Sequence, residues 1–288
     1  DKTTARHCFG AADRWVHRRM KPTIYFRQGD WTDTAEFDAA KRYFHTVRCR
    51  TEIPTGRLVI PRYSMLPFPE ELVADVKNLG GRLINTVQQH DFVADISIWS
   101  RYLNGLTPPA YFQWANLPKG AYVIKGFTNS RKHEWRNRMF APTREDIPRI
   151  VNSLLDDDLI KSQGIVVRPY VPLRKLGEGI NGLPISNEWR FFVVDGLILC
   201  GGFYWASEPD CCPTEGPCTP PNGALTIAHK AIARVGTRIP FFVVDVAEKA
   251  DGDWIVIELN DGCMSGLSMI PPDMLYKALA EHLGANGD

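Results

Sequence analysis

The sequence lacks several features that would assign it to a class at once. None of its apolar runs approaches the ~20 residues that a membrane helix needs, so we expect no membrane partner. An excess of one charge is also missing, since 34 Lys and Arg stand against 33 Asp and Glu, and nothing in this balance indicates nucleic acid. The first residues contain no apolar signal-peptide core, and we predict that residues 1–21 form a mobile leader outside the fold.

Cysteine is present without the pattern of a disulfide framework. The seven cysteines are odd in number and irregularly spaced, which favours the reducing cytoplasm as the location. Cys211, Cys212 and Cys218 suggest zinc, but their spacing matches no standard ligand pattern and no His is close by in sequence. We therefore expect this Pro-rich stretch to be a surface loop that happens to carry thiols.

The 288 residues suffice for about two domains. The first part alternates short apolar runs with helical patterns, and the pattern predicts a small parallel α/β layer. Its expected strands are Thr23–Arg27, Leu58–Ile60 and Arg82–Asn85, and its expected helices are Thr34–Phe44 and Pro69–Leu79. A helical stretch near Ile96–Leu103 and the breaker Thr107-Pro108-Pro109 follow, so we place this domain at residues 22–118.

The second part, residues 119–288, mixes strands, hairpins and helices and predicts an α+β domain. Its expected strands are Ala121–Lys125, Ile165–Val167, Glu188–Val194 and Leu197–Cys200, the last two joined at Asp195-Gly196. Its expected helices are Arg144–Asp158, Leu225–Ala233 and Pro271–Leu283.

One further hairpin carries acidic residues on otherwise apolar strands. Phe241–Val246 and Trp254–Leu259 flank Asp251-Gly252, and a two-residue turn there sets Asp245 opposite Glu258 and Val243 opposite Asn260. In that register Asp245, Glu258 and Asn260 share one face, and the other face is formed by Phe242, Val244, Val246, Ile255, Ile257 and Leu259. Facing carboxylates repel, whereas Mg²⁺ binds such a set, so we favour a metal site over a merely hydrated polar face.

Two cations also stand out. Lys125 ends a strand and is followed by a loop of small and hydroxyl residues, which can cradle phosphates or be a solvated basic turn. Arg190 lies on a strand that reads as buried, so it needs an anion: Glu188, Asp245 or a ligand phosphate.

In chain order these pieces resemble the ATP-grasp superfamily, and the phrases KGFTNSRK, VVRPYVPL, NEWRFFVVDG and ELNDG look similar to a branch known from bacteria and phages. The resemblance runs from Thr23 to the C-terminus. It implies an α+β ATP-grasp fold with lobes at about 119–162 and 163–288. A small Rossmann-like pre-ATP-grasp α/β domain would precede them.

The resemblance also implies roles for individual residues. Lys125 would lie on the ATP phosphates, Arg190 would reach phosphate or an acyl phosphate, and Mg²⁺ (or Mn²⁺) would bind Asp245, Glu258 and Asn260. Nucleotide contacts are further implied for Ser130, Arg131, Lys132, Val166, Arg168, Tyr170, Val171 and Glu188. The phosphate loop has less glycine than is usual in the family, so Arg131 or Lys132 takes over contacts. Pro169 has no N–H to offer adenine.

The activity implied by the resemblance is an Mg²⁺- and ATP-dependent ligase that joins a carboxylate to an amine through an acyl phosphate. The acceptor is an amino acid, a peptide or a protein, and Arg174 and Ser265 are candidate substrate residues. Two alternatives are phosphoryl or nucleotidyl transfer to a small molecule or nucleic-acid end, and a catalytically idle nucleotide-binding module. The retained acids argue against the idle module.

Overall fold

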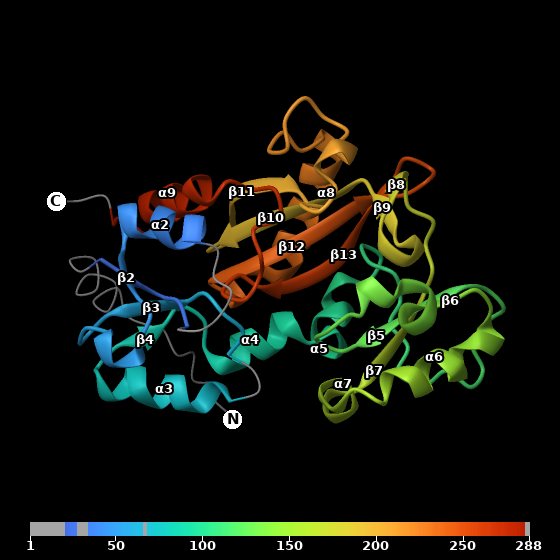
Figure 1. Ribbon diagram of the computed structural model, residues 1–288, viewed down its shortest axis with the longest axis horizontal. Helices are drawn as coiled ribbons and strands as arrows, with labels where there is room; N and C mark the ends of the chain where they lie inside the picture. The colour runs from blue at the N-terminus through green and yellow to red at the C-terminus, as the bar shows by residue number, and fades with distance from the viewer. Residues whose placement is uncertain (1–20, 28–33, 66–67, 286–288) are drawn as a thin grey trace, which may run out of the picture. The chain divides into compact units, whose positions relative to one another are not determined.

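A computed structural model describes residues 21–27, 34–65 and 68–285 of the chain (Figure 1). Almost all of the predicted leader lies outside these residues. The described residues up to Ile84, together with those from Pro272 onward, form one compact unit, and Asn85–Pro271 form another. The predicted domain boundary near Pro118 stays a prediction.

The first unit is built on a parallel sheet, in agreement with the predicted α/β layer. Its strand order is β2-β1-β3-β4, and every neighbouring pair is parallel. The strands are β1 (Thr23–Tyr25), β2 (His45–Val47), β3 (Leu58–Pro61) and β4 (Arg82–Leu83). Strand β2 was not predicted, because its sequence His-Thr-Val contains a single aliphatic residue and so no apolar run.

Helices cover both faces of this sheet. They are α2 (Thr34–Tyr43), α3 (Pro69–Asn78) and α9 (Pro272–Leu283). Helices α2 and α9 lie on one side of the sheet and α3 on the other (Figure 1). The C-terminal helix is tied to α2, since the Tyr276 hydroxyl donates to Glu36 Oε1 at 2.7 Å. The same carboxylate pairs with Arg62 at 2.8 Å.

The second unit contains an antiparallel sheet of order β11-β10-β12-β13. Its strands are β10 (Glu188–Val194), β11 (Leu197–Phe203), β12 (Phe241–Glu248) and β13 (Trp254–Asp261). Helix α8 (Asn222–Val235) packs on one face, where side chains such as Phe191, Phe242 and Val244 are fully buried. The other face carries the charged residues.

The register of β12 and β13 confirms the predicted pairing but not the predicted turn. Asp245 faces Glu258, and Val243 faces Asn260. The register then shifts, so that Val246 faces Val256 and Ile257 is the extra residue of a bulge. The connecting loop is longer than two residues, because the Lys249 N–H donates to the Asp253 carbonyl at 2.7 Å. The longer loop and the bulge compensate each other, which preserves the predicted pair.

The bulge also changes which side chains share a face. Val256 joins the core beneath α8, whereas Ile255 and Ile257 line the same pocket as Glu258. The prediction that placed Ile255 and Ile257 with the core face was therefore wrong, because one bulged residue inverts the alternation along the strand.

A smaller sheet of order β6-β5-β7 lies in the same unit. Its strands are β5 (Tyr122–Gly126), β6 (Phe140–Ala141) and β7 (Ile165–Pro169), and they pack with α6 (Ile147–Leu154) and α7 (Asp158–Gln163). The remaining α-helices and strands of this unit are α4 (Val87–Ala94), α5 (Ile96–Trp99) and the hairpin of β8 (Lys175–Glu178) and β9 (Pro184–Ser186). Helix α4 and the β8–β9 hairpin were not predicted.

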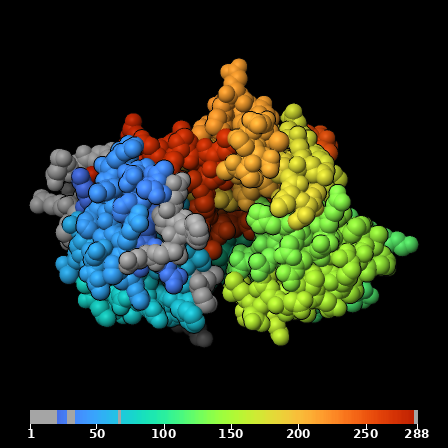
Figure 2. Space-filling model, viewed as in Figure 1, coloured from blue at the N-terminus to red at the C-terminus, as the bar shows by residue number. Residues whose placement is uncertain are grey.

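The Pro- and Cys-rich stretch after β11 is a loop, as expected, and the orange segment that contains it projects from the surface of its unit (Figure 2). Across residues 21–27, 34–65 and 68–285, no group of three His, Cys, Asp or Glu is arranged to hold a metal. The cysteines of this part of the chain are free thiols. Within these described ranges, no helix combines the length and apolarity needed to cross a bilayer.

Candidate functional site

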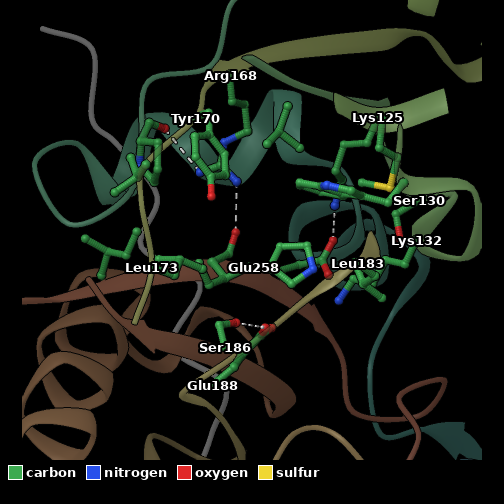
Figure 3. Close-up of a pocket in the computed structure, with 18 of the residues that line it drawn as sticks. Lys125, Ser130, Lys132, Arg168, Tyr170, Leu173, Leu183, Ser186, Glu188 and Glu258 are labelled. Atoms are coloured by element: carbon green, nitrogen blue, oxygen red, sulfur yellow. Dashed lines mark hydrogen bonds and ion pairs between the residues drawn. The ribbon is translucent and has the colours of Figure 1, made fainter. Parts of the chain in front are cut away.

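A pocket lies where the β6-β5-β7 sheet faces the charged side of the β11-β10-β12-β13 sheet, inside the Asn85–Pro271 unit. Eight of the residues predicted for the site line it: Lys125, Ser130, Lys132, Arg168, Tyr170, Val171, Glu188 and Glu258. In Figure 3, Lys125, Ser130 and Lys132 lie on one side of the pocket and Tyr170 and Leu173 on the other. We call the side with Lys125 and Lys132 the basic end of the pocket, and the side with Tyr170 and Leu173, near which Arg168 also lies, the apolar end.

Lys125 and Glu258 form an ion pair at the basic end. The Lys125 ammonium at the end of β5 donates to Glu258 Oε1 on β13. Only 9% of the Lys125 side chain and 17% of the Glu258 side chain are exposed, so water screens the pair weakly. Burial raises the pKa of Glu258, but Lys125 and then Lys132 more than offset this and hold it below its ordinary value. The Glu258 carboxylate is therefore ionised at neutral pH.

Arg190 and Asp245 form a second ion pair next to the first. Arg190 Nε donates to Asp245 Oδ1 at 2.8 Å, and Nη2 donates to Oδ2 at 2.7 Å. Burial lowers the pKa of Arg190, but the effect of Asp245 is opposite and larger, so the pKa stays above its ordinary value. Because Arg190 faces Asp245 and Asp245 faces Glu258 across β10, β12 and β13, the two pairs form one row in which the two carboxylates stand side by side between Arg190 and Lys125.

Glu188 is the most perturbed acid of the pocket. It is 3% exposed, and burial raises the pKa of its carboxyl to about 7, although Lys132 opposes the shift. Ser186 Oγ donates to Oε2 at 3.4 Å, and Oε1 has no hydrogen-bond partner among the described residues. Lys132 itself donates to the Tyr204 hydroxyl at 2.7 Å, and Tyr204 and Glu188 raise its pKa against the effect of burial.

Arg168 connects the strand β7 to its surroundings. Its Nη1 donates to the Ile257 carbonyl at 2.9 Å, and its Nη2 donates to Thr107 Oγ1 at 2.5 Å and to the Pro108 carbonyl at 3.2 Å. Burial lowers the pKa of Arg168 to about 10, and it stays a cation at neutral pH. The guanidinium is thus committed to fixing the Ile257 bulge.

The other predicted nucleotide contacts between Val166 and Val171 divide between the pocket and the core. The Tyr170 and Val171 residues line the pocket, and the Tyr170 N–H donates to the Ala121 carbonyl at 2.9 Å. Val166 is fully buried and pairs with Lys125 in the β5–β7 ladder.

Several predicted residues lie outside the pocket lining and have partners elsewhere. Arg131 pairs with Asp157, and Arg174 pairs with Glu248 at 2.9 Å. Ser265 is buried, and its hydroxyl donates to the Asp261 carbonyl at 2.8 Å. The roles predicted for these three residues stay predictions.

The donor set fits a magnesium ion that brings ligands of its own. Glu258 offers a carboxylate to the pocket, whereas both oxygens of Asp245 accept hydrogen bonds from Arg190. The side-chain oxygen of Asn260 accepts the Asp261 N–H at 2.9 Å and has a second lone pair. Mg²⁺ commonly takes one or two carboxylates together with waters and substrate phosphates, so two acids and an amide are a sufficient protein contribution.

Tyr204 contacts the pocket residue Lys132 and was not predicted from the sequence. It follows β11 and holds Lys132 by its hydroxyl, and the Arg190 guanidinium lies 4.8 Å from its ring centroid. No periodicity marks such a residue, because its role depends on a loop about seventy positions away.

Comparison with known proteins adds three observations. The family model for the ATP-grasp domain, R2K clade family 3, matches residues 112–279. No curated protein sequence matches the chain. Among solved structures, the fold is similar to that of D-cycloserine synthetase DcsG, with 14% identity, a TM-score of 0.59, and coverage of 91% of this chain and 99% of that one.

Two further structures share the fold. One is D-alanine–D-alanine ligase from Bacillus anthracis complexed with ATP, with 13% identity, a TM-score of 0.55, and coverage of 92% of this chain and 97% of that one. The other is ATP-grasp ligase PsnB complexed with precursor peptide PsnA2 and AMPPNP, with 11% identity, a TM-score of 0.53, and coverage of 91% and 97%.

Proposed function

Since the chain belongs to the ATP-grasp domain family 3 of the R2K clade, we propose that it is an Mg²⁺- and ATP-dependent ligase that joins a carboxylate to an amine through an acyl phosphate. The observation that carries the proposal is the row Arg190–Asp245–Glu258–Lys125 beside the pocket. Phosphoryl activation needs cations and a metal around the transferring group more than it needs a protein nucleophile.

Each charge in the row has a proposed task. Bound MgATP would supply the phosphoryl group that activates the carboxylate. Lys125 and Lys132 line the basic end and hold the phosphates, while Glu258 and Asn260, with Asp245, hold the metal. Arg190 is proposed to reach the phosphate or acyl phosphate from beneath Tyr204, and Ser130 and Arg131 are proposed as further contacts of the phosphate loop.

The apolar end suits a nucleotide base. Tyr170 and Leu173 lie at this end (Figure 3), and the apolar residues Val171, Ile255 and Ile257 also line the pocket. The Tyr170 N–H is already bonded to Ala121 and Pro169 has none, so we propose the Val171 backbone as the base contact. Arg168 supports this end by fixing the strand that carries Ile257.

The acceptor is proposed to be an amine on an amino acid, a peptide or a protein. The structures that share the fold include one ligase named for D-alanine and one complexed with a precursor peptide, which supports screening both kinds of acceptor. Arg174 and Ser265 remain the proposed substrate residues. The free thiols of the described part of the chain support the cytoplasm as the proposed location.

The proposal is tested first by titrating ATP into the protein calorimetrically, with and without Mg²⁺. We expect binding that requires Mg²⁺ and that a Glu258→Ala/Asn260→Ala variant loses. Asp273→Asn is the matched control, because it removes a charge from the half-exposed Arg42–Asp273 pair of the other unit and should bind like wild type. Wild-type protein that binds no ATP with Mg²⁺, or a double variant that binds it equally well, would contradict the proposal.

The reaction type is decided by the products. A ligase releases ADP and free phosphate in the presence of a carboxylate and an amine, whereas a phosphoryl transferase leaves phosphate on the acceptor. Turnover that yields phosphorylated acceptor and no amide would replace the ligase with the transferase.

A further inference from the structure

A buried carboxylate follows directly after the proposed metal ligand Asn260. The Asp261 side chain has no exposed surface and lies at the last position of β13. Its Oδ1 accepts the Cys263 N–H at 2.6 Å, and its Oδ2 accepts Asn85 Nδ2 at 3.0 Å and lies 3.0 Å from His90 Nδ1. An ionised group is this deeply buried only where several donors compensate its lost hydration.

One of the two side-chain partners, Asn85, joins the start of β12 to the end of β13. Asn85 Nδ2 donates to the Phe241 carbonyl at 2.6 Å, and Asn85 Oδ1 accepts the Phe241 N–H at 3.0 Å. Asn85 thus pairs with the backbone of one strand and with the terminal side chain of the next. Its amide holds the two strand ends in register where the ladder ends at the Phe242–Asp261 pair, one residue after Asn260.

His90 brings helix α4 to the same point. The helix begins at a capping box formed by Thr86 and Gln89, and Gln89 Nε2 also donates to the Arg238 carbonyl at 2.9 Å. The His90 side chain is 1% exposed and has Asp261 at Nδ1, while Nε2 has no hydrogen-bond partner among the described residues. Within the part of the chain that the structure describes, Asp261 is therefore the polar partner of the His90 side chain.

The loop after Asp261 leads back to the charged row. The Asp261 carbonyl accepts the Met264 and Ser265 N–H groups at 3.2 and 3.1 Å, which closes a tight turn. Gly266 follows, and its carbonyl accepts Arg190 Nη1 at 2.8 Å. The same guanidinium grips Asp245, so the turn at Asp261 and the proposed metal ligand Asp245 are connected through one side chain.

We infer that Asp261, held by His90 and Asn85, is a positioning residue for the metal site. It sets the direction of Asn260 on one side and the placement of the 262–266 loop against Arg190 on the other. This inference rests on the proposed function. Partners that orient metal ligands typically change metal affinity by about 10- to 100-fold when they are removed, whereas a purely structural contact changes stability alone.

The test uses the full chain and measures the Mg²⁺ concentration that gives half-maximal ATP binding. Asp261→Asn keeps the shape but sets an amide N–H₂ among groups that are themselves donors, so we expect this concentration to rise about 10-fold or more. His90→Leu removes one partner of Asp261 and should also raise the Mg²⁺ concentration for half-maximal ATP binding. His90→Asn retains a donor near the Nδ1 position and should restore a value close to wild type.

Glu36→Gln is the matched control, since Glu36 is a largely buried carboxylate that pairs with Arg62 and Tyr276 in the other unit. It should lower the melting temperature without changing the Mg²⁺ requirement. If Asp261→Asn does not fold, the comparison of His90→Leu with His90→Asn tests the inference. An unchanged Mg²⁺ requirement in folded His90→Leu protein would overturn the inference, whereas wild-type protein without Mg²⁺-dependent ATP binding would instead overturn the proposed function on which it rests.

Discussion

The Arg190–Asp245 pair allows stability and function to be separated experimentally. Its side chains are 9% and 1% exposed and form two parallel hydrogen bonds, so removing one partner leaves the other charge buried and unpaired. Such single changes cost about 3–5 kcal/mol, whereas replacing both partners with apolar residues of similar volume is often neutral. We expect Arg190→Met and Asp245→Asn to destabilise strongly, and Arg190→Met/Asp245→Leu to recover most of the loss.

The row of charges predicts which of the two single variants loses more free energy of unfolding. Arg190→Met removes the cation of Asp245, while Glu258 keeps Lys125. Asp245 then faces Glu258 without a cation of its own, and the two carboxylates repel across the ladder. Asp245→Asn leaves the guanidinium with the Gly266 carbonyl and one amide oxygen. The cost should therefore lie near the upper end of ~3–5 kcal/mol for Arg190→Met and near the lower end for Asp245→Asn.

The assay is chemical denaturation of these proteins and of Asp245→Leu, monitored by the fluorescence of tryptophans such as Trp189, which is fully buried on the same strand as Arg190. Wild type, Arg190→Met, Asp245→Leu and Arg190→Met/Asp245→Leu close a double-mutant cycle, and we expect a coupling of about 2 kcal/mol or more between the two positions. MgATP binding should be lost in the double variant even though its stability returns. A coupling below about 0.5 kcal/mol would refute the reasoning, because it would mean that water screens the pair.

Three further predictions follow from the same unit. Burial raises the pKa of Glu188 to about 7, so the folded protein retains a proton that the unfolded chain releases near pH 4.5. The free energy of unfolding should therefore fall by on the order of 3 kcal/mol as pH rises between these two values, and Glu188→Gln should remove this fall. Parallel pH profiles of stability for wild type and Glu188→Gln would contradict the prediction. In Arg168→Lys, the lysine cannot reach all three acceptors of the Arg168 guanidinium, and the free energy of unfolding should fall by about 2–3 kcal/mol in the same denaturation assay. A change below about 0.5 kcal/mol would show that the three hydrogen bonds are dispensable. Gly262→Ala sets a methyl group 2.8 Å from the Phe241 ring and should destabilise by about 1–3 kcal/mol, whereas Gly266→Ala, with nothing within 4 Å, should change the melting temperature little.

Much of the fold follows from local patterns in the sequence. Strand β10 has the predicted bounds, and the parallel sheet of the first unit and the antiparallel hairpins of the second appear as expected. Hydrophobic periodicity works for these elements because each must bury one face or both. It fails for β2, β8 and β9, because each of them contains a single aliphatic residue and so no apolar run.

The facing of Asp245 and Glu258 was predictable, but the reason given for it was incomplete. The sequence indicated a turn at Asp251-Gly252, whereas the structure has a longer loop and a bulge at Ile257 that offset each other. A bulge depends on what the strand packs against: here Arg168 from another sheet bonds the Ile257 carbonyl. Local sequence does not contain that contact.

The sequence by itself determined which chemical groups are present and which strands carry them: a lysine at the end of β5, an arginine on β10, and acids on β12 and β13. Only the tertiary structure decided how these charges pair. It set Arg190 on Asp245 and Lys125 on Glu258, raised the pKa of Glu188 by burial, and gathered Asn85, His90 and Asp261 from distant segments. The physical reason is that ion pairing and desolvation depend on distances between strands, which chain order does not specify.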